Sequence, residues 1–176
     1  MRGFIADVPL FLPGVAFAAV VGIAVAPALA RFLYTRAIVA FLLVLGVGAI
    51  VSATLTPTTE ALSRGIVSYQ TCDLSRLGLA SLGELTSINT VSQNVVLFIP
   101  LGLALGLLPG TRRNITIVLG AFLLTVFVEM AQLLLPVPGR GCESADIVDN
   151  TMGLVIGLSI GLLAKSVAGL ARATDE

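Results

Sequence analysis

Residues 37–55 have the sequence AIVAFLLVLGVGAIVSATL, which is apolar almost throughout and contains no charged side chain. An α-helix rises about 1.5 Å per residue, so about 20 apolar residues are needed to cross a hydrocarbon core of about 30 Å. In lipid the stretch must be helical, because every backbone polar group has to be paired within the protein. This stretch therefore predicts a transmembrane helix.

The rest of the chain has the same character. Hydrophobic residues make up 57% of the 176 residues, charged residues make up 11%, and the mean hydropathy is +1.05. A water-soluble domain cannot bury that much apolar surface. Further apolar stretches lie at about residues 8–30, 93–108, 115–135 and 147–168. We expect an all-α fold, a polytopic membrane helix bundle of about five transmembrane helices that forms a single membrane domain over residues 1–176.

Charges between the apolar stretches predict the orientation. The joints at residues 31–36 and 110–114 each contain two Arg and no acidic residue, and the C-terminal end carries Lys165 and Arg172. Basic segments of this kind stay in the cytoplasm. The N-terminus is therefore expected outside and the C-terminus inside. The extracytoplasmic loops are then residues 56–92 and 136–145, within a few residues.

The longer outer loop contains a periodic apolar pattern. Leu74, Leu77, Leu79 and Leu82 recur at roughly helical spacing between Gly and Ser residues. This pattern predicts a short helix that lies on the membrane surface, and so a partly structured outer loop.

Cys72 and Cys142 are the two cysteines of the sequence, and the expected topology places one in each outer loop. Thiols oxidise outside the cytoplasm, so we predict a disulfide between them. In the chain-entropy model, closing a loop of about 70 residues stabilises the folded state by about 4 kcal/mol. The bridge would hold the longer loop over the outer ends of the helices.

Composition excludes several functions. No histidine occurs in the sequence, which rules out a Ser-His-Asp triad and any His-ligated metal site. The ten basic residues are scattered and the net charge is zero, so no nucleic-acid partner is expected. Any proton transfer would fall to carboxylates.

Polar residues inside the apolar stretches are the most informative. Glu129 lies deep in the fourth stretch, and Gln132 lies one helical turn nearer its outer end on the same face. An ionisable side chain at such depth is costly in lipid and usually faces a partner inside the bundle.

More polar residues enter the same region from other stretches. Asp146, Asp149 and Asn150 share one face of the last stretch, and Asn94 lies at the start of the third. Arg140 is the cation nearest to them in the sequence. We predict an outward-facing acidic and amide pocket. The candidate catalytic groups are Glu129, Asp149 and Asp146. The candidate substrate-binding groups are Asn94, Gln132, Arg140 and Asn150.

Simpler roles remain open for several of these residues. Asp146 can complement the dipole at a helix N-terminus, and Asn94 and Gln132 can join helices by hydrogen bonds. Arg140 can neutralise a neighbouring acid. Alternatively, a divalent cation such as Ca²⁺ or Mg²⁺ could be bound by oxygen ligands. The possible ligands are Glu129, Asp146, Asp149 and Asn150.

Glycines at four-residue spacing indicate where helices approach one another. Gly102 and Gly106 form one such pair in the third stretch, and Gly153, Gly157 and Gly161 form a longer series in the last. Small residues let helix backbones come close together in lipid. These faces are therefore expected to lie in the interior of the bundle.

The order and spacing of the polar residues resemble the VanZ-like family, over a motif core at about residues 94–161. The resemblance is carried by NVVLFIPLG at residues 94–102, Glu129-x-x-Gln132, Gly139-Arg140 and Asp146-x-x-Asp149-Asn150-Thr-x-Gly153. VanZ-like proteins are bacterial membrane proteins named for one that lowers susceptibility to the glycopeptide teicoplanin. The resemblance implies a multi-pass protein of the bacterial plasma membrane. It also implies that the family's polar positions here are Asn94, Glu129, Gln132, Arg140, Asp146 and Asn150.

The resemblance and the polar cluster together suggest a cell-envelope function. We expect the protein to bind or modify a lipid-linked or head-group substrate at the outer leaflet, with membrane lipid as a partner. A lipid-linked cell-wall precursor or a glycopeptide is a further candidate partner, which would connect the protein to antibiotic resistance. The alternatives are a non-catalytic envelope protein that binds or shields such a molecule, and a proton-coupled transporter that uses Glu129 as a relay.

Overall fold

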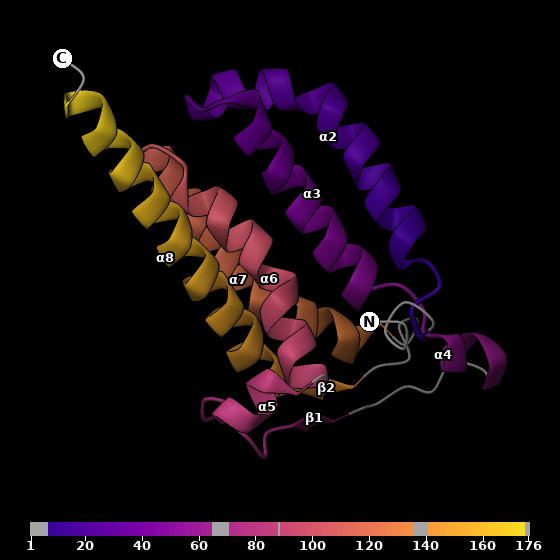
Figure 1. Ribbon diagram of the computed structural model, residues 1–176. Coiled ribbons are helices and arrows are strands. Elements are labelled where there is room, and N and C mark those ends of the chain that lie inside the picture. Colours follow the sequence, from indigo (N-terminus) through magenta and orange to yellow (C-terminus); the bar gives the residue numbers. More distant parts are fainter. Residues whose placement is uncertain (1–6, 65–70, 88, 136–140, 175–176) are drawn as a thin grey trace.

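The computed structural model describes residues 7–64, 71–87, 89–135 and 141–174, and it is a bundle of helices (Figure 1). The long helices are α2 (Phe11–Leu33), α3 (Ala37–Thr54), α6 (Thr90–Gly106), α7 (Arg112–Leu134) and α8 (Ser144–Thr174). The segments between α3 and α6 and before α8 contain α4 (Thr59–Arg64), β1 (Cys72–Asp73), α5 (Leu82–Thr86) and β2 (Cys142–Glu143). The all-α bundle is confirmed, and the loop after α3 is partly structured as expected.

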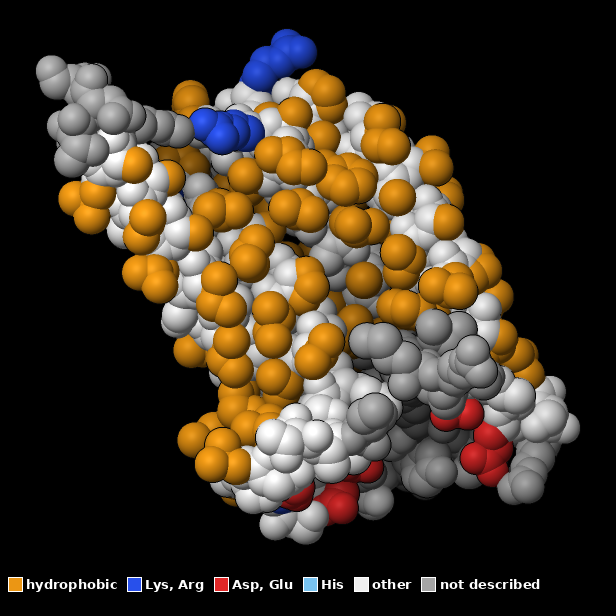
Figure 2. All heavy atoms as spheres, viewed as in Figure 1, with side chains coloured by type: hydrophobic (Ala, Val, Ile, Leu, Met, Phe, Trp, Pro, Cys, Tyr) orange, Lys and Arg blue, Asp and Glu red, His pale blue; other side chains and the backbone are white. Residues whose placement is uncertain are grey.

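The long helices have the length and composition of membrane spans. α2, α3, α7 and α8 are each long and apolar enough to cross a bilayer, whereas α6 is shorter, with 17 residues. At about 1.5 Å per residue, α6 is about 25 Å long. Apolar side chains cover most of the visible flank of the bundle (Figure 2). A surface of this kind is stable in lipid and not in water, so the protein is a membrane protein.

Each apolar stretch of the sequence became one helix, with small shifts at the ends. At the basic joints, α7 begins at Arg112 instead of residue 115, and α2 continues past residue 30 to Leu33. There the chain turns through Tyr34, which has a left-handed φ of 53°, and the N–H of Thr35 donates to the carbonyl of Ala30 at 3.0 Å. Arg31 did not end the helix, because its charged group can reach the membrane surface from the last turn.

The predicted surface helix through Leu74–Leu82 is wrong. These residues are not helical up to Ser81, and the helix that forms, α5, begins at Leu82. Two local interactions oppose a helix before this point: the N–H of Ser75 donates to Oδ1 of Asp73 at 2.8 Å, and Nη1 of Arg76 donates to the carbonyl of Gly78 at 3.1 Å. Such side-chain bonds satisfy the backbone without helical pairing.

α6 and α8 lie side by side and form the tightest contact in the bundle (Figure 1). Their glycines make this contact possible. A Cβ atom on Gly153 would collide with the carbonyl oxygen of Val95, and one on Gly157 would collide with that of Ile99. The two helix backbones therefore touch along the glycine faces that the sequence predicts.

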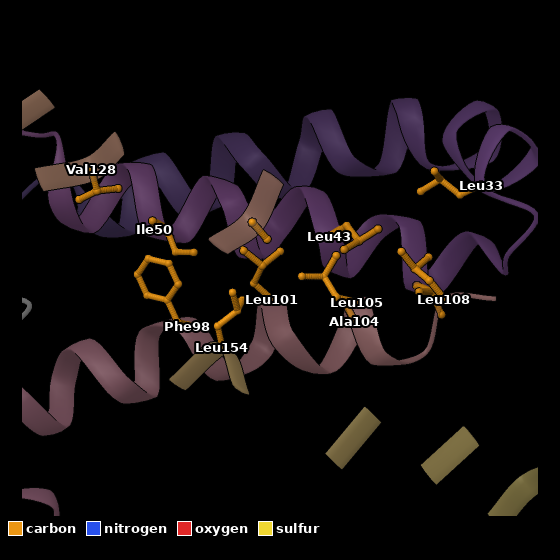
Figure 3. Packing of buried hydrophobic residues seen from close by; sticks show 12 residues of the cluster. Leu33, Leu43, Ile50, Phe98, Leu101, Ala104, Leu105, Leu108, Val128 and Leu154 are labelled. Carbon is orange, nitrogen blue, oxygen red and sulfur yellow. The ribbon is translucent and has the colours of Figure 1, made fainter. Parts of the chain in front are cut away.

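An apolar core joins this pair to the other helices (Figure 3). Phe98 of α6 is completely buried and lies in the same cluster as Ile50 of α3, Val128 of α7 and Leu154 of α8. The cluster extends to Leu33 at the end of α2. Because the bilayer is itself apolar, this packing stabilises the bundle mainly through dispersion contacts and close fit.

Hydrogen bonds from α7 hold the α2–α3 hairpin at both ends. Asn114, in the first turn of α7, donates from Nδ2 to the carbonyl of Leu33 at 3.2 Å. Gln132, in the last turn, donates from Nε2 to the carbonyl of Thr54 at 3.1 Å. Next to Asn114, the guanidinium of Arg113 donates to the carbonyl of Phe32 and stacks 3.9 Å from the centre of its ring.

Most charged side chains separate to opposite ends of the bundle, with Lys and Arg mainly at one end of the visible face and Asp and Glu at the other (Figure 2), whereas Arg76 lies among the acidic residues. We call the first the basic end; it carries Arg31, Arg36, Arg112, Arg113 and Lys165. We call the second the acidic end; it carries Asp7, Asp73, Glu84, Glu143 and Asp146, together with β1, β2 and α5. This separation is what the positive-inside rule needs, and the predicted orientation, N-terminus out and C-terminus in, follows from that rule.

Candidate functional site

A disulfide fastens the loop after α3 to the start of α8. Cys72 and Cys142 are bonded, with their Cα atoms 4.6 Å apart, as the sequence predicts. The two residues are also partners in a short parallel pairing of β1 with β2, in which Asp73 lies opposite Glu143. This link, across 70 residues of sequence, carries the segment after Cys72 onto the ends of the helices.

The segment that the disulfide positions includes Arg76, which forms an ion pair with Asp149. Nη2 of Arg76 lies 2.5 Å from Oδ2 of Asp149, whose side chain is completely buried in α8. The hydroxyl of Ser144 donates to the carbonyl of Arg76 at 2.8 Å and fixes the same segment. The hydrogen bond to Asp149 raises the pKa of Arg76 above its ordinary value, so the cation stays charged.

The sequence did not identify Arg76 as the partner of Asp149. Arg140 is the nearest cation in the sequence, and it lies outside the described residues. A signal for Arg76 was nevertheless present, because a bridge between Cys72 and Cys142 brings the residues that follow each cysteine to the same place. Arg76 lies four residues after Cys72, and Asp149 lies seven residues after Cys142.

Glu129 is also engaged by the backbone at the acidic end. Its side chain is 2% exposed, and its Oε2 accepts a hydrogen bond from the N–H of Glu143 at 2.9 Å. This bond ties the half of α7 at the acidic end to β2. A buried carboxylate is stabilised by such a bond, which is stronger than one between neutral groups.

A polar cavity of about 300 Å³ opens at the acidic end, where three long helices begin or end. It is lined by Asp7, Thr90, Gln93, Gln132, Gly141, Glu143 and Asp146. Thr90 and Gln93 come from the first turn of α6, Gln132 from the last turn of α7, and Asp146 from the first turn of α8. The cavity therefore lies at the ends of the spans and not in their middle.

Gln132 lines this cavity and carries an unsatisfied hydrogen-bond acceptor. The side chain is 4% exposed, and its Oε1 has no hydrogen-bond partner. The amide orientation follows from chemistry, because the carbonyl of Thr54 can only accept and so must face Nε2. A buried amide oxygen without a partner costs about 1–3 kcal/mol unless a ligand or water donates to it.

The structure distributes the predicted site residues over two layers. Gln132 and Asp146 line the cavity. Asn94, Glu129, Asp149 and Asn150 are buried and do not line it. Nδ2 of Asn94 and Oδ1 of Asn150 have no hydrogen-bond partner, so the buried layer also keeps unused polar atoms.

Thr90, Gln93, Glu143 and Asp7 line the cavity but were not predicted to belong to the site. Gln93 precedes Asn94 directly and faces the cavity because it lies in the first helical turn, where side chains reach the membrane surface. Thr90 lies before the apolar stretch at residues 93–108, and Glu143 and Asp7 could not be placed because their positions depend on how the segments before α8 and α2 return to the bundle.

The predicted divalent cation site has no matching cluster in the described part of the chain. Within it, no group of three or more His, Cys, Asp or Glu side chains lies close enough together to hold a metal ion. Asp149, one of the predicted ligands, forms an ion pair with Arg76. The described lining offers carboxylates, amides and a hydroxyl, which suit hydrogen bonding to a polar ligand.

Comparison with protein-family models identifies the family of the chain. The family model described as VanZ/LLP1 matches residues 38–165, which include α3, the disulfide, α6, α7 and the polar part of α8. Every described residue of the cavity except Asp7 lies in that range. No curated protein and no solved structure matches the chain. Because the match covers more than half of the chain, this VanZ-like membrane protein belongs to the VanZ/LLP1 family.

Proposed function

We propose that the cavity at the acidic end binds the polar head group of an envelope lipid or of a lipid-linked substrate. The observation that carries this proposal is the side chain of Gln132, which lines a polar cavity and whose buried Oε1 has no hydrogen-bond partner. A native protein rarely keeps such an atom unpaired, so a bound polar group is its expected partner.

The location of the cavity supports a head group as the ligand. Its lining residues belong to the first or last turns of membrane spans, which lie at the level of lipid head groups. The basic loops at the opposite end favour an orientation in which the cavity faces the outer leaflet of the bacterial plasma membrane. A lipid could then enter from the side while its acyl chains remain in the bilayer.

Binding is a simpler role for this site than catalysis. Asp149 is engaged with Arg76, and Glu129 accepts a hydrogen bond from the backbone of Glu143, so both carboxylates have structural partners. A catalytic role for Glu129, Asp146 or Asp149 stays a prediction. Its test requires a reaction that can be assayed. An effect on teicoplanin susceptibility is a further prediction, supported by the family resemblance. It would arise if the protein held a lipid or lipid-linked precursor that the glycopeptide meets at the membrane.

Lipid retention tests the proposal. The full chain is extracted from nanodiscs of total bacterial lipid, and the phospholipid molecules that remain bound are counted by native mass spectrometry. Gln132→Met removes the acceptor with little change of volume, and we expect it to lower retention about tenfold, because one buried hydrogen bond contributes about 1–2 kcal/mol.

Asn114→Leu is the matched control, because Asn114 is also a buried amide of α7 with an unpartnered oxygen, but at the basic end. It should leave retention at the acidic end unchanged. Equal retention by the wild type and both folded variants would refute the proposal.

A further inference from the structure

We infer that a second cavity, at the basic end, binds the head group of an anionic phospholipid. This cavity is separate from the one at the acidic end, and its ligand would belong to the opposite leaflet of the membrane. Its lining combines two cations, an aromatic hydroxyl and apolar side chains.

The cavity lies between the beginning of α3 and the last third of α8. Its volume is about 560 Å³, and the loop after α6 completes its lining. The turn between α2 and α3 and the C-terminal part of α8 are at the same end of the bundle (Figure 1). The lining therefore belongs to the ends of membrane spans, which is the level of lipid head groups.

Two cations line the cavity, Arg36 at the start of α3 and Lys165 in α8, whereas the described lining includes no Asp or Glu. Neither cation forms an ion pair within the described residues. Lys165 donates to the carbonyl of Leu108 at 2.7 Å, and this neutral acceptor leaves its charge uncompensated. α3 begins without a side-chain cap, so its first N–H groups add to the positive potential. An anion in this cavity is attracted by all these groups.

Tyr34 adds a hydrogen-bond donor to the two cations. Its φ of 53° lies in the left-handed region, where glycine would be less strained. The chain nevertheless has a large side chain here, and that side chain lines the cavity. A tyrosine hydroxyl can donate to a phosphate oxygen while the ring stays among apolar groups at the membrane surface.

The apolar part of the lining favours a lipid over a soluble anion. Ile38 and Val39 of α3 and Leu107 after α6 line the same cavity as the cations. The side chain of Ile38 is 59% exposed, so this apolar surface is open to the membrane. A phospholipid uses both parts of the lining, because its phosphate meets the cations and its glycerol and acyl chains meet the apolar side chains.

Head-group competition tests this inference. The full chain is placed in nanodiscs with equal amounts of phosphatidylglycerol and phosphatidylcholine that carry the same acyl chains, and the retained lipids are identified by native mass spectrometry. The choline group adds a cation that Arg36 and Lys165 repel, whereas phosphatidylglycerol has none. We expect about 20-fold preferential retention of phosphatidylglycerol, because each surface cation near an anionic lipid contributes about fivefold.

The full chain also carries Asp175 and Glu176, which lie outside the described residues. Equal retention of the two lipids by the wild type would overturn the inference, whichever group meets the cations instead.

A pair of charge variants assigns the preference to the cavity. Arg36→Gln removes a lining cation and should lower the preference about fivefold. Arg31→Gln is the matched control, because Arg31 is an exposed cation in the last turn of α2 and does not line the cavity. Equal losses in the two variants would show that diffuse charge attracts the lipid and would overturn the inference.

A pair of glycine variants tests the shape of the site without changing its charge. Gly169 lines the cavity, and a Cβ atom there would meet no atom within 4 Å, so Gly169→Leu can fill the space without a clash. It should abolish most of the preference. Gly120→Leu is the control, because Gly120 has the same free space in α7 and does not line this cavity. A preference that survives Gly169→Leu would overturn the inference.

Two further outcomes identify the site and the source of the anion. Gln132→Met, which tests the cavity at the acidic end, should leave the preference for phosphatidylglycerol unchanged. Loss of the preference in that variant would place the anionic lipid at the acidic end and overturn the inference, whatever the fate of the proposed function. Release of phosphatidylglycerol by millimolar inorganic phosphate at constant ionic strength would overturn its assignment to a lipid.

Discussion

The two ends of α7 are held in the same way but surrounded differently. At the basic end, the buried amide of Asn114 donates to the carbonyl of Leu33 in α2, and at the acidic end, the buried amide of Gln132 donates to the carbonyl of Thr54 in α3. Each amide oxygen is left without a hydrogen-bond partner. The two bonds therefore play the same structural part, which is to hold the α2–α3 hairpin against α7.

The surroundings of the two amides differ in charge. A cavity of about 230 Å³ beside Asn114 is mostly apolar and is bordered by Lys165, which donates to the carbonyl of Leu108 at 2.7 Å. The cavity beside Gln132 is bordered by Asp7, Glu143 and Asp146. An unpaired buried amide oxygen therefore occurs at both ends, and our proposal for the acidic end depends also on the polar lining of the cavity beside Gln132.

The largest difference between the ends should appear when the disulfide is removed. The chain-entropy model sets an upper limit of about 4 kcal/mol for the loss of stability in the Cys72→Ser, Cys142→Ser double variant. The observed loss should be smaller, because the helices between the cysteines remain in the membrane. Hydrogen exchange should become faster at residues 141–149 and stay unchanged at residues 31–36. Equal acceleration of hydrogen exchange at both ends would contradict a structural role of the disulfide at the acidic end alone.

The ion pair should have the next largest effect, and an asymmetric one. Arg76→Met leaves Asp149 buried without its cation, which should lower the free energy of unfolding by about 3 kcal/mol. Asp149→Asn should cost less, since the side chain of Arg76 is 26% exposed and can turn to water. Thermal unfolding in detergent measures both, and Arg36→Met, an exposed cation at the basic end, is the control. A larger loss for Asp149→Asn than for Arg76→Met would show that the pairing is wrong.

The amide bonds should have the smallest effects on stability. Asn114→Leu removes donations to two carbonyls, those of Leu33 and Pro109, and should cost about 2 kcal/mol, whereas Gln132→Met removes one and should cost about 1 kcal/mol. Equilibrium unfolding of the two variants in the same detergent measures this difference. A larger loss of stability for Gln132→Met than for Asn114→Leu would show that the bond to Thr54 stabilises the fold more than its geometry indicates.

Much of the fold could be predicted from the sequence because it depends on local properties. The length of an apolar stretch sets a membrane helix, the spacing of Gly153 and Gly157 sets a packing face, and the presence of only two cysteines in outer loops sets the disulfide. The surface helix at residues 74–82 was predicted wrongly because leucine spacing ignores the side-chain bonds of Asp73 and Arg76.

The site could be predicted only in part, because its members meet through the folding of loops. Gln132 and Asp146 were identified since polar residues in apolar stretches are conspicuous. The pairing of Arg76 with Asp149, separated by 73 residues, depends on the disulfide bringing the two segments together. The contribution of Glu143 depends on β2 folding over α7, which no periodic pattern in the sequence reports.

The measurement that tests this account most directly is which end of the bundle faces outward. A third cysteine is introduced at Ser75 at the acidic end, or at Thr35 or Gly110 at the basic end, while the native disulfide is kept so that Cys72 and Cys142 do not react. Intact cells are then treated with a membrane-impermeant maleimide. The account predicts labelling of Ser75→Cys, and labelling of Thr35→Cys and Gly110→Cys only after the cells are opened. Labelling of the basic-end cysteines in intact cells, with Ser75→Cys protected, would contradict an outward-facing head-group site.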